Sequence, residues 1–201
     1  MNKKVWGIIL AAGYSRRMGT AKLLLPFKGK TILRHVIDHA LHSALYGITV
    51  VINPDIPDLV KEASIPGIDK IVINEKASQG MSASVKSGLH TVPANADAAM
   101  FLLGDLPLLT ADEMNSVIRD YYQHKTSKLI IQAKYGDQQG HPVLFDRSLF
   151  SDLLHVSGDE GGRSIIKIYK QEVYYSEIGK KITSDIDTQA DYQNLLREEV
   201  C

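Results

Sequence analysis

The segment from residue 10 to residue 22 combines small and basic residues in a way that suits a polyphosphate. It reads Leu-Ala-Ala-Gly-Tyr-Ser-Arg-Arg-Met-Gly-Thr-Ala-Lys. Small residues let the backbone approach a ligand closely, and successive backbone N–H groups in such a turn can form an anion-binding nest. A guanidinium group can bind two phosphate oxygens at once, whereas an ammonium acts as a point charge. The small positions are Ala11, Ala12 and Gly13, which follow Leu10, and the basic ones are Arg16, Arg17 and Lys22.

The same segment could instead be a surface loop whose charges are solvated. Its place after an apolar run and its three basic residues favour phosphate binding. It is neither a Walker A loop nor a Rossmann fingerprint, because Gly-x-x-x-x-Gly-Lys-Ser/Thr and Gly-x-Gly-x-x-Gly are both absent. We therefore predict that this loop binds the triphosphate of a nucleotide through contacts of its own.

Carboxylates in two other segments could hold a divalent cation. Asp105 ends an apolar run within Gly-Asp-Leu-Pro, and Asp185 and Asp187 precede the last predicted helix. Mg²⁺ is typically held by one or two carboxylates together with phosphate oxygens and water. Alternation places Asp185 and Asp187 on the same face of an extended segment, so either could join Asp105 as a ligand. Gly-Asp is also a common turn, and Asp187 or Thr188 could simply cap the helix that follows.

These segments need a scaffold that brings strand ends together, and the first two thirds of the chain predict one. Short apolar runs alternate there with stretches of helical periodicity. The predicted strands are residues 5–12, 47–53, 70–74 and 98–103, and the predicted helices are residues 31–45, 81–90 and 110–124. This alternation is typical of βαβ units, and it predicts an α/β fold with a mostly parallel sheet and helices on both faces. In such sheets ligands bind beyond the carboxyl ends of the strands, where residues 11–13 and 104–105 fall.

Two of these helices have residues that suit a helix start. Ser82 is a candidate cap for the helix over residues 81–90. Thr110 is followed three positions later by Glu113, which is the pattern of a capping box.

The last third of the chain is less regular. Residues 129–133, 142–145 and 173–178 are predicted strands, and residues 146–154 and 188–197 are predicted helices. The sequence has no repeats, no low-complexity tract and no linker rich in Pro, Gly or Ser. We therefore expect residues 1–201 to form a single domain, in which the last third completes the sheet and covers the second half of the site.

Charge and composition exclude several classes of partner. The chain of 201 residues has 23 basic and 23 acidic side chains, so we expect no nucleic acid partner. Its single cysteine, Cys201, rules out a disulfide framework within the chain and a cysteine-based metal cluster. No apolar stretch approaches the roughly 20 residues that a membrane span needs, and the N-terminal residues do not have the pattern of a signal peptide. We expect a protein of the reducing cytoplasm that does not contact a membrane.

Taken in order, these segments resemble the molybdenum cofactor cytidylyltransferase family, within the wider group of nucleotide-sugar-type nucleotidyltransferases. The resemblance covers nearly the whole chain. Two positions depart from the family pattern: Gly162, where members usually have alanine, and Gln189, where they often have proline. The matching segments are residues 10–22, Leu24-Leu25-Pro26, Gly29, Gln79-Gly80-Met81-Ser82-Ala83-Ser84, Gly104-Asp105-Leu106-Pro107, Gly140-His141-Pro142-Val143-Leu144-Phe145, residues 158–163 and Asp185-Ile186-Asp187-Thr188.

The resemblance implies a three-layer αβα fold of Rossmann-like topology, of the nucleotide-diphospho-sugar transferase type. It implies transfer of CMP from CTP to the terminal phosphate of molybdenum-molybdopterin, with release of pyrophosphate. The product would be the molybdopterin cytosine dinucleotide cofactor of xanthine dehydrogenase-type hydroxylases, which links the protein to purine catabolism. A transient contact with such a molybdenum hydroxylase is also implied.

The resemblance also assigns roles to residues of this chain. It implies Mg²⁺ as the cofactor, with Asp105 and Asp187 as ligands, and it gives catalytic roles to Lys22, Arg17 and Asp105. His141 and Arg163 could face the acceptor, although a loop histidine and a solvated arginine would give the same pattern. The predicted nucleotide-binding residues are Leu10, Ala11, Ala12, Gly13, Arg17, Lys22, Gly80, Ser82 and Asp105, with Gln79 and Ser84 also near the base.

The choice of base and acceptor has alternatives. Related enzymes that use GTP tend to have Leu-Ala-Gly-Gly in the first loop, so Ala12 favours cytosine, by about 1–3 kcal/mol for one methyl group. The rivals are a guanylyltransferase of the same cofactor and a cytidylyl- or uridylyltransferase of a sugar phosphate. A non-catalytic cofactor carrier or chaperone for a molybdenum hydroxylase is a rival of another class. Such a protein is expected to have lost Lys22, Asp105 or Asp187, and all three are present.

Overall fold

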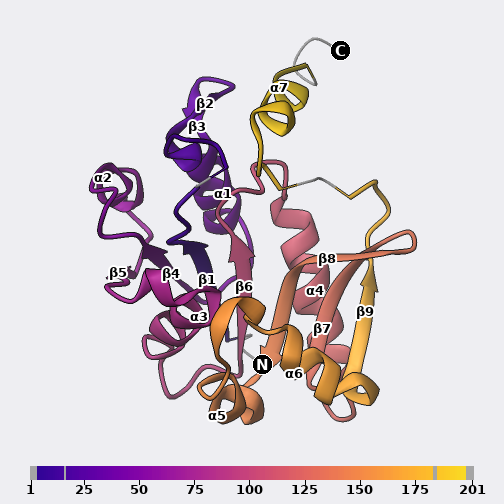
Figure 1. The fold of residues 1–201 in the computed structure, drawn as a ribbon. Helices are drawn as coiled ribbons and strands as arrows, with labels where there is room; N and C mark the ends of the chain where they lie inside the picture. The colour runs from indigo at the N-terminus through magenta and orange to yellow at the C-terminus, as the bar shows by residue number, and fades with distance from the viewer. Residues whose placement is uncertain (1–3, 16, 183–184, 198–201) are drawn as a thin grey trace.

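A seven-stranded sheet forms the centre of the computed structural model, which describes residues 4–15, 17–182 and 185–197. Its strands are β1 (Val5–Ala11), β4 (Gly47–Ile52), β5 (Lys70–Ile73), β6 (Ala98–Leu103), β7 (Ile130–Tyr135), β8 (Gln138–Asp146) and β9 (Val173–Glu177). They are arranged in the order β5-β4-β1-β6-β8-β7-β9 (Figure 1). Six of these strands share one direction, and β8 runs antiparallel to both β6 and β7. The predicted mostly parallel sheet is confirmed.

Helices cover both faces of the sheet and complete three layers (Figure 1). One face packs against α1 (Ile32–Leu41), α2 (Asp58–Ala63), α4 (Ala111–His124) and α7 (Gln189–Arg197). The other face packs against α3 (Met81–Leu89), α5 (Phe150–Leu153) and α6 (Arg163–Ile168). Each face of the sheet packs into its own hydrophobic core. In strand β1, Ile9 lies in one core and its neighbour Ile8 in the other, so both faces of the strand are buried. The predicted αβα architecture is confirmed.

Several element boundaries differ from the prediction. The helix predicted to reach residue 45 ends at Leu41, because the Ser43 hydroxyl donates to the Ala40 carbonyl at 2.6 Å and replaces a helical contact. The helix predicted from residue 146 begins later, since Asp146 ends β8 and accepts a hydrogen bond from the Ser148 N–H. Helices α2 and α6 and the hairpin β2 (Pro26–Phe27) and β3 (Lys30–Thr31) were not predicted, because all are too short to show a periodic pattern.

The two predicted helix starts have different outcomes. Ser82 does not cap α3: it lies inside the helix and is buried, and Gly80 occupies the N-cap position with φ of 96°. At the start of α4, Glu113 Oε2 accepts from the Thr110 N–H at 2.8 Å and from the Thr110 hydroxyl at 2.6 Å. The capping-box prediction is therefore confirmed, and the Ser82 cap was wrong.

Gly104 brings the carboxyl ends of β1 and β6 close together. A Cβ at this position would lie 3.1 Å from the Leu10 carbonyl oxygen and 3.3 Å from the Ala11 Cβ. The Gly104 N–H donates to the Leu10 carbonyl at 3.0 Å. Glycine thus allows the approach that places Asp105 beside the first loop.

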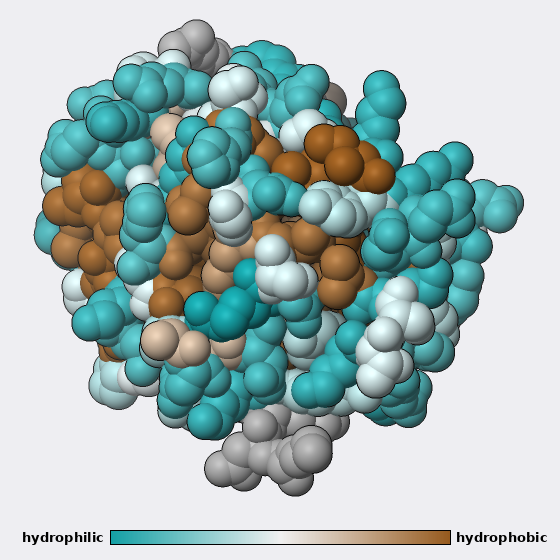
Figure 2. Space-filling view, turned by 90° about the horizontal axis from the view of Figure 1, so that it is seen from below, coloured by the Kyte–Doolittle hydropathy of each residue, from teal (hydrophilic) through white to brown (hydrophobic). Residues whose placement is uncertain are grey.

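The surface seen in Figure 2 is mixed, with apolar side chains in several patches separated by polar ones. The large hydrophobic residues with the most exposure are Tyr14, Tyr46, Ile73, Met81 and Ile168. None of the helices in the described part of the chain has both the length and the apolar character of a membrane span.

The capping carboxylate predicts a measurable stability difference. Glu113 is buried and also accepts from the Tyr135 hydroxyl at 2.7 Å and pairs with Lys180 at 2.6 Å. Glu113→Ala is expected to lower the free energy of unfolding by about 3 kcal/mol, because it removes a buried carboxylate that accepts hydrogen bonds from Thr110 and Tyr135 and pairs with Lys180. The matched control is Glu177→Ala, which breaks the surface pair with Lys134 and should cost less than about 1 kcal/mol. Urea unfolding measures both, and equal losses would contradict the prediction.

Candidate active site

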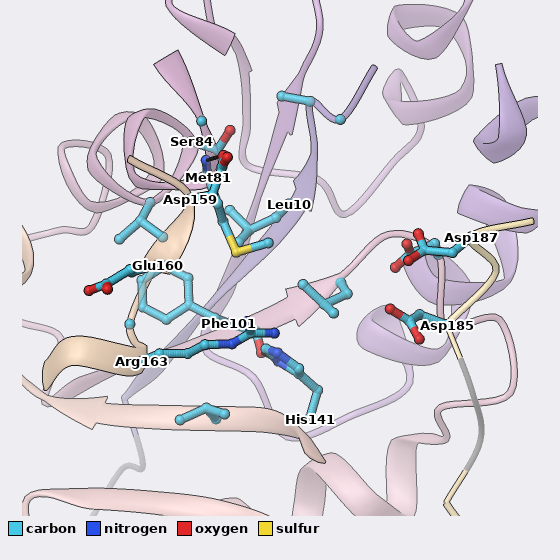
Figure 3. A pocket seen from close by; sticks show the side chains of 18 of the residues that line it. Leu10, Met81, Ser84, Phe101, His141, Asp159, Glu160, Arg163, Asp185 and Asp187 are labelled. Carbon is cyan, nitrogen blue, oxygen red and sulfur yellow. Dashed lines mark hydrogen bonds between the residues drawn. The ribbon is translucent and has the colours of Figure 1, made fainter. Parts of the chain in front are cut away.

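A cavity of about 680 Å³ opens beyond the carboxyl ends of β1 and β6. On one side it is lined by the first loop and by the start of α3, and on the other by β7, β8 and the segment leading into α6. Figure 3 shows Asp185 and Asp187 at one edge of the cavity, with Arg163 extending towards His141 at another. This is the edge of the sheet where the sequence predicted ligand binding.

The Lys22 ammonium lies between two carboxylates at the mouth of this cavity. Its Nζ is 2.6 Å from Asp105 Oδ2 and 2.9 Å from Asp187 Oδ1. Arg17 adds a second cation, with a guanidinium nitrogen 2.9 Å from Asp187 Oδ2. Asp185 completes the acidic group, since Asp105, Asp185 and Asp187 each offer an oxygen within 4.8 Å of the others. The structure therefore brings together the basic loop and both acidic segments that the sequence singled out.

Mutual pairing sets the charge states of these groups. Burial by itself lowers the pKa of Lys22, but the charges of Asp105 and Asp187 raise it above its usual range. The hydrogen bond from Lys22 lowers the pKa of the Asp187 carboxyl. Burial raises the pKa of Asp105, and the neighbouring Asp185 adds to this while Lys22 opposes it. Lys22 therefore stays protonated, and the three carboxylates around it can attract a further cation.

The acidic group suits a divalent cation by the chemistry of its donors. Carboxylate oxygens are the hard ligands that Mg²⁺ and Mn²⁺ prefer, and such sites use one or two carboxylates with phosphate and water. Three carboxylates within 4.8 Å meet this requirement, with phosphate-binding cations directly beside them. The residues that could hold such an ion are therefore Asp105, Asp185 and Asp187. The sequence pattern had left open whether Asp185 or Asp187 lies near Asp105, and in the structure both do.

The segment before α7 presents its two carboxylates on one face, as alternation predicted. Ile186 between them is buried in the core, and its N–H donates to the Asp105 carbonyl at 3.4 Å. The helix start is served by other residues: the Asp191 carboxylate accepts from the Thr188 N–H at 2.7 Å, and the Asp191 N–H donates to the Thr188 hydroxyl at 3.2 Å. Because Thr188 and Asp191 serve the start of α7, neither the Asp185 nor the Asp187 carboxylate is used as its cap, and both residues line the cavity.

Most of the predicted nucleotide-binding residues line the cavity, although their role stays a prediction. Ala11 and Ser82 do not line it: Ala11 packs in the core at the end of β1, and Ser82 is buried within α3. Arg16 and Cys201 lie outside the described residues. Gln79, predicted near the base, does not line the cavity either, whereas the predicted metal ligand Asp187 does. The predicted nucleotide-binding residues that line it are Leu10, Ala12, Gly13, Arg17, Lys22, Gly80, Ser84 and Asp105.

The start of α3 is held against the segment over residues 158–160. The Met81 N–H donates to Asp159 Oδ1 at 3.3 Å. A Cβ on Gly80 would lie 2.4 Å from Asp159 Oδ1 and 2.7 Å from the Gly158 carbonyl oxygen, so only glycine fits there. These contacts join the two walls of the cavity at the side remote from Asp187.

Sequence reasoning missed much of the wall opposite the first loop. We call this part of the cavity the acceptor lobe and define it by Phe101, Gln132, His141, Phe145, Arg163 and Ile166, all of which line the cavity. His141 and Arg163 had been named as candidates, but the other four had not. Gln132 and Phe101 lie on strands that are separated in the sheet by β8, so only the pairing of both strands with β8 could have revealed them.

His141 faces the lobe in a largely buried setting. Its Nδ1 lies 3.4 Å from the Phe101 carbonyl oxygen. Burial lowers the pKa of His141, and the contact with the Phe101 carbonyl and the charge of Asp105 oppose this only in part, so the neutral imidazole is favoured. Arg163 has no hydrogen-bonding or ionic partner among the described residues, so its guanidinium is available to an anion.

The basic loop after the first strand and the carboxylate group beside it suit the binding of a nucleoside triphosphate together with a divalent cation. Residues 7–173 match the model of the MobA-like NTP transferase domain family, and the chain belongs to that family. It is a nucleotidyltransferase of the MobA-like type.

Relatives and solved structures agree with this assignment. The chain is 30% identical over 174 residues to the purine catabolism protein PucB of Bacillus subtilis, covering 80% of each chain. Its fold matches the homologue of Mycobacterium tuberculosis Rv0371c from Mycobacterium sp. strain JC1, with a TM-score of 0.86, 29% identity and coverage of 100% and 98% of the two chains. It also matches Rv0371c of M. tuberculosis in complex with manganese, with a TM-score of 0.79, 24% identity and coverage of 97% and 99%.

The acidic group predicts how metal binding responds to substitution. Asp105→Asn and Asp187→Asn are each expected to weaken Mn²⁺ binding by about 100-fold or more. Mutating a residue that only supports a metal ligand typically weakens metal affinity by about 10- to 100-fold, and loss of the ligand itself should weaken it at least as much. Electron paramagnetic resonance of free Mn²⁺ measures this in the full-length protein. The exposed Asp58→Asn is the matched control and should leave the affinity unchanged. Full Mn²⁺ affinity in both site variants would contradict the assignment.

Proposed function

We propose that this protein transfers CMP from CTP to the terminal phosphate of molybdenum-molybdopterin. The observation that carries the proposal is the convergence of Lys22 and Arg17 from the first loop with Asp105 and Asp187 at one edge of a two-walled cavity. One wall fits a nucleoside triphosphate, and the acceptor lobe leaves room for a second substrate. The resemblance of the ordered motifs supports the choice of acceptor, and the similarity to PucB, a purine catabolism protein, supports a role in supplying a purine hydroxylase.

The reaction needs positioning more than a strong base. An oxygen of the acceptor phosphate attacks the α-phosphorus of CTP, a new P–O bond forms, and the bond to pyrophosphate breaks. A phosphate monoester is largely ionised at pH 7, because its second pKa is about 6. The described residues contain no Ser-His-Asp or Cys-His arrangement at the cavity that could act as a base, and none is required. Catalysis of this kind depends on alignment and on neutralising charge.

The chain's own residues would supply that alignment. Lys22 and Arg17, released from their carboxylate partners, bind the β- and γ-phosphate oxygens and balance the charge of the departing pyrophosphate. Asp105 and Asp187 would hold Mg²⁺, with Asp185 beside them, and the ion when bound draws negative charge from the phosphates. The manganese complex of the similar Rv0371c supports a divalent cation here. Arg163 would bind an anionic group of the acceptor.

The experiment that tests the proposal is a transfer assay with the purified full-length protein. With CTP, Mg²⁺ and molybdenum-molybdopterin, we expect pyrophosphate release that requires all three and a cytosine dinucleotide product identified by mass spectrometry. Release that prefers GTP would instead indicate the guanylyltransferase, and transfer to a sugar phosphate would indicate the sugar-nucleotide enzyme. Tight binding of the cofactor without any release of pyrophosphate would support the carrier alternative and overturn the proposal.

Ala12 gives a sharper prediction about the base. Its side chain lines the cavity, and its carbonyl accepts from Asn53 Nδ2 at 3.1 Å, which fixes the backbone there. Ala12→Gly is expected to raise the ratio of kcat/KM for GTP over CTP by about tenfold or more, within the 10–200-fold range of one methyl group. Ala11→Gly removes a methyl group from the adjacent core position and is the control that should leave the ratio unchanged. An unchanged ratio in Ala12→Gly would remove Ala12 from the base site.

A further inference from the structure

Gln132 is a buried polar residue of β7 that the proposed chemistry does not use. Only 9% of it is exposed, yet it lines the cavity. Its Nε2 donates to the Gly140 carbonyl at 3.4 Å, whereas its Oε1 has no hydrogen-bond partner among the described residues. Reversing the amide would set two oxygens against each other, so the neighbouring carbonyl favours this orientation. A buried acceptor without a partner costs free energy that an apolar side chain would not, and it calls for a physical reason.

The register of the sheet places Gln132 in the floor of the acceptor lobe. Gln132 pairs with Val143 of β8, and Val143 pairs with Phe101 of β6. Alternate residues of β8 point to the same face, and His141 and Phe145 line the cavity beside Val143. Gln132 therefore lies in the floor of the lobe, with its unpaired oxygen buried beneath the surface that a second substrate would contact.

Two phenyl rings form part of the lobe beside the polar residues His141 and Arg163. The rings of Phe101 and Phe145 pack edge to face with centroids 5.8 Å apart, and Ile166 of α6 also lines the lobe. A polyol phosphate would set hydroxyl groups against these apolar side chains, which is unfavourable where the hydroxyl groups find no partner. A planar heteroaromatic ring would instead pack on the phenyl rings and bring an N–H to a buried acceptor.

We propose that Gln132 determines acceptor specificity: its Oε1 accepts a hydrogen bond from a ring N–H or amino group of a planar, phosphorylated nitrogen heterocycle. The inference rests on the proposed function, because it assumes that the lobe holds the acceptor. It adds the residue that selects the ring and the reason a sugar phosphate is rejected. A site built to pair with one polar group rejects analogues that lack it far more strongly than a purely apolar pocket does.

The test compares binding of two probes to the full-length protein and its variants. The probes are 6-hydroxymethylpterin monophosphate, followed by its own fluorescence, and erythritol 4-phosphate, followed by calorimetry. The wild type is expected to bind the pterin phosphate at least tenfold more tightly than the sugar phosphate. Gln132→Met keeps the length of the side chain and removes the acceptor, and it should weaken pterin phosphate binding by about tenfold, which equals about 1.4 kcal/mol.

Ser176→Ala is the matched control, because it also removes a buried oxygen without a hydrogen-bond partner. Ser176 lies on β9, is fully buried and does not line the cavity. It should leave the affinity for pterin phosphate unchanged. Binding of CTP with Mn²⁺ should be unchanged in both variants. The thermal midpoint of Gln132→Met should be close to that of the wild type, since the loss of the unpaired oxygen offsets the loss of the long bond from Nε2 to the Gly140 carbonyl.

Several results would overturn the assignment of Gln132. These are equal affinity of wild type and Gln132→Met for pterin phosphate, a parallel loss of CTP binding, or a wild type that binds no pterin phosphate or prefers erythritol 4-phosphate. A lower thermal midpoint without a change in affinity would show a purely structural role. Failure of the proposed function is a separate outcome: pterin phosphate binding that depends on Gln132, without CMP transfer to molybdenum-molybdopterin, would overturn the transfer and leave the assignment standing.

Discussion

The Lys22 ammonium between Asp105 and Asp187 is the interaction on which the rest of the site depends. Asp105, Asp185 and Asp187 come from two segments far apart in the sequence, and their oxygens lie within 4.8 Å of one another. Like charges about 4 Å apart repel by about 4 kcal/mol at an effective dielectric of 20, and by less where they are exposed. Such a group forms only with positive charge inside it. Lys22 supplies that charge and ties the first loop, the end of β6 and the segment before α7 to one point.

The fold holds this point from both sides. Gly104 lets β6 end against β1, so the chain delivers Asp105 to the loop without strain. On the C-terminal side, Lys180 pairs with Glu113 at 2.6 Å and donates to the Leu108 carbonyl at 3.0 Å. Glu113 is in turn the capping residue of α4. The Glu113 carboxylate therefore caps α4 and also holds Lys180, which precedes Asp185 and Asp187 in the chain. These two roles give a physical reason for a buried charge at residue 113.

Sequence alone predicted the parts of the fold and site that local pattern determines. The strands of the first two thirds were recognisable because residues such as Ile8 and Ile9 are both buried, and the first loop because its basic residues follow such a strand. Helices α2 and α6, each of six residues, were too short to show a period. Ser82 was mistaken for a cap because the left-handed conformation of Gly80, which begins α3, cannot be inferred from residue type alone. Gln132 and Phe101 escaped notice since their meeting depends on the register of three strands.

The two halves of the cavity therefore differ in how easily their residues can be recognised in the sequence. The half of the cavity around Lys22 is built from short segments whose chemistry is visible in the sequence, and its charges pair with one another in the structure. The lobe around Gln132 is built from single residues on β6, β7, β8 and α6, and one of its polar atoms, Gln132 Oε1, has no partner among the described residues. Local rules are expected to fail at sites under functional constraint, where a sequence accepts a cost that packing alone would remove. The unpaired amide oxygen of Gln132 is such a cost. Unlike the Ser176 hydroxyl, which is also unpaired, it belongs to a residue that lines the cavity, and this argues that the missing partner is a ligand rather than a further part of the protein.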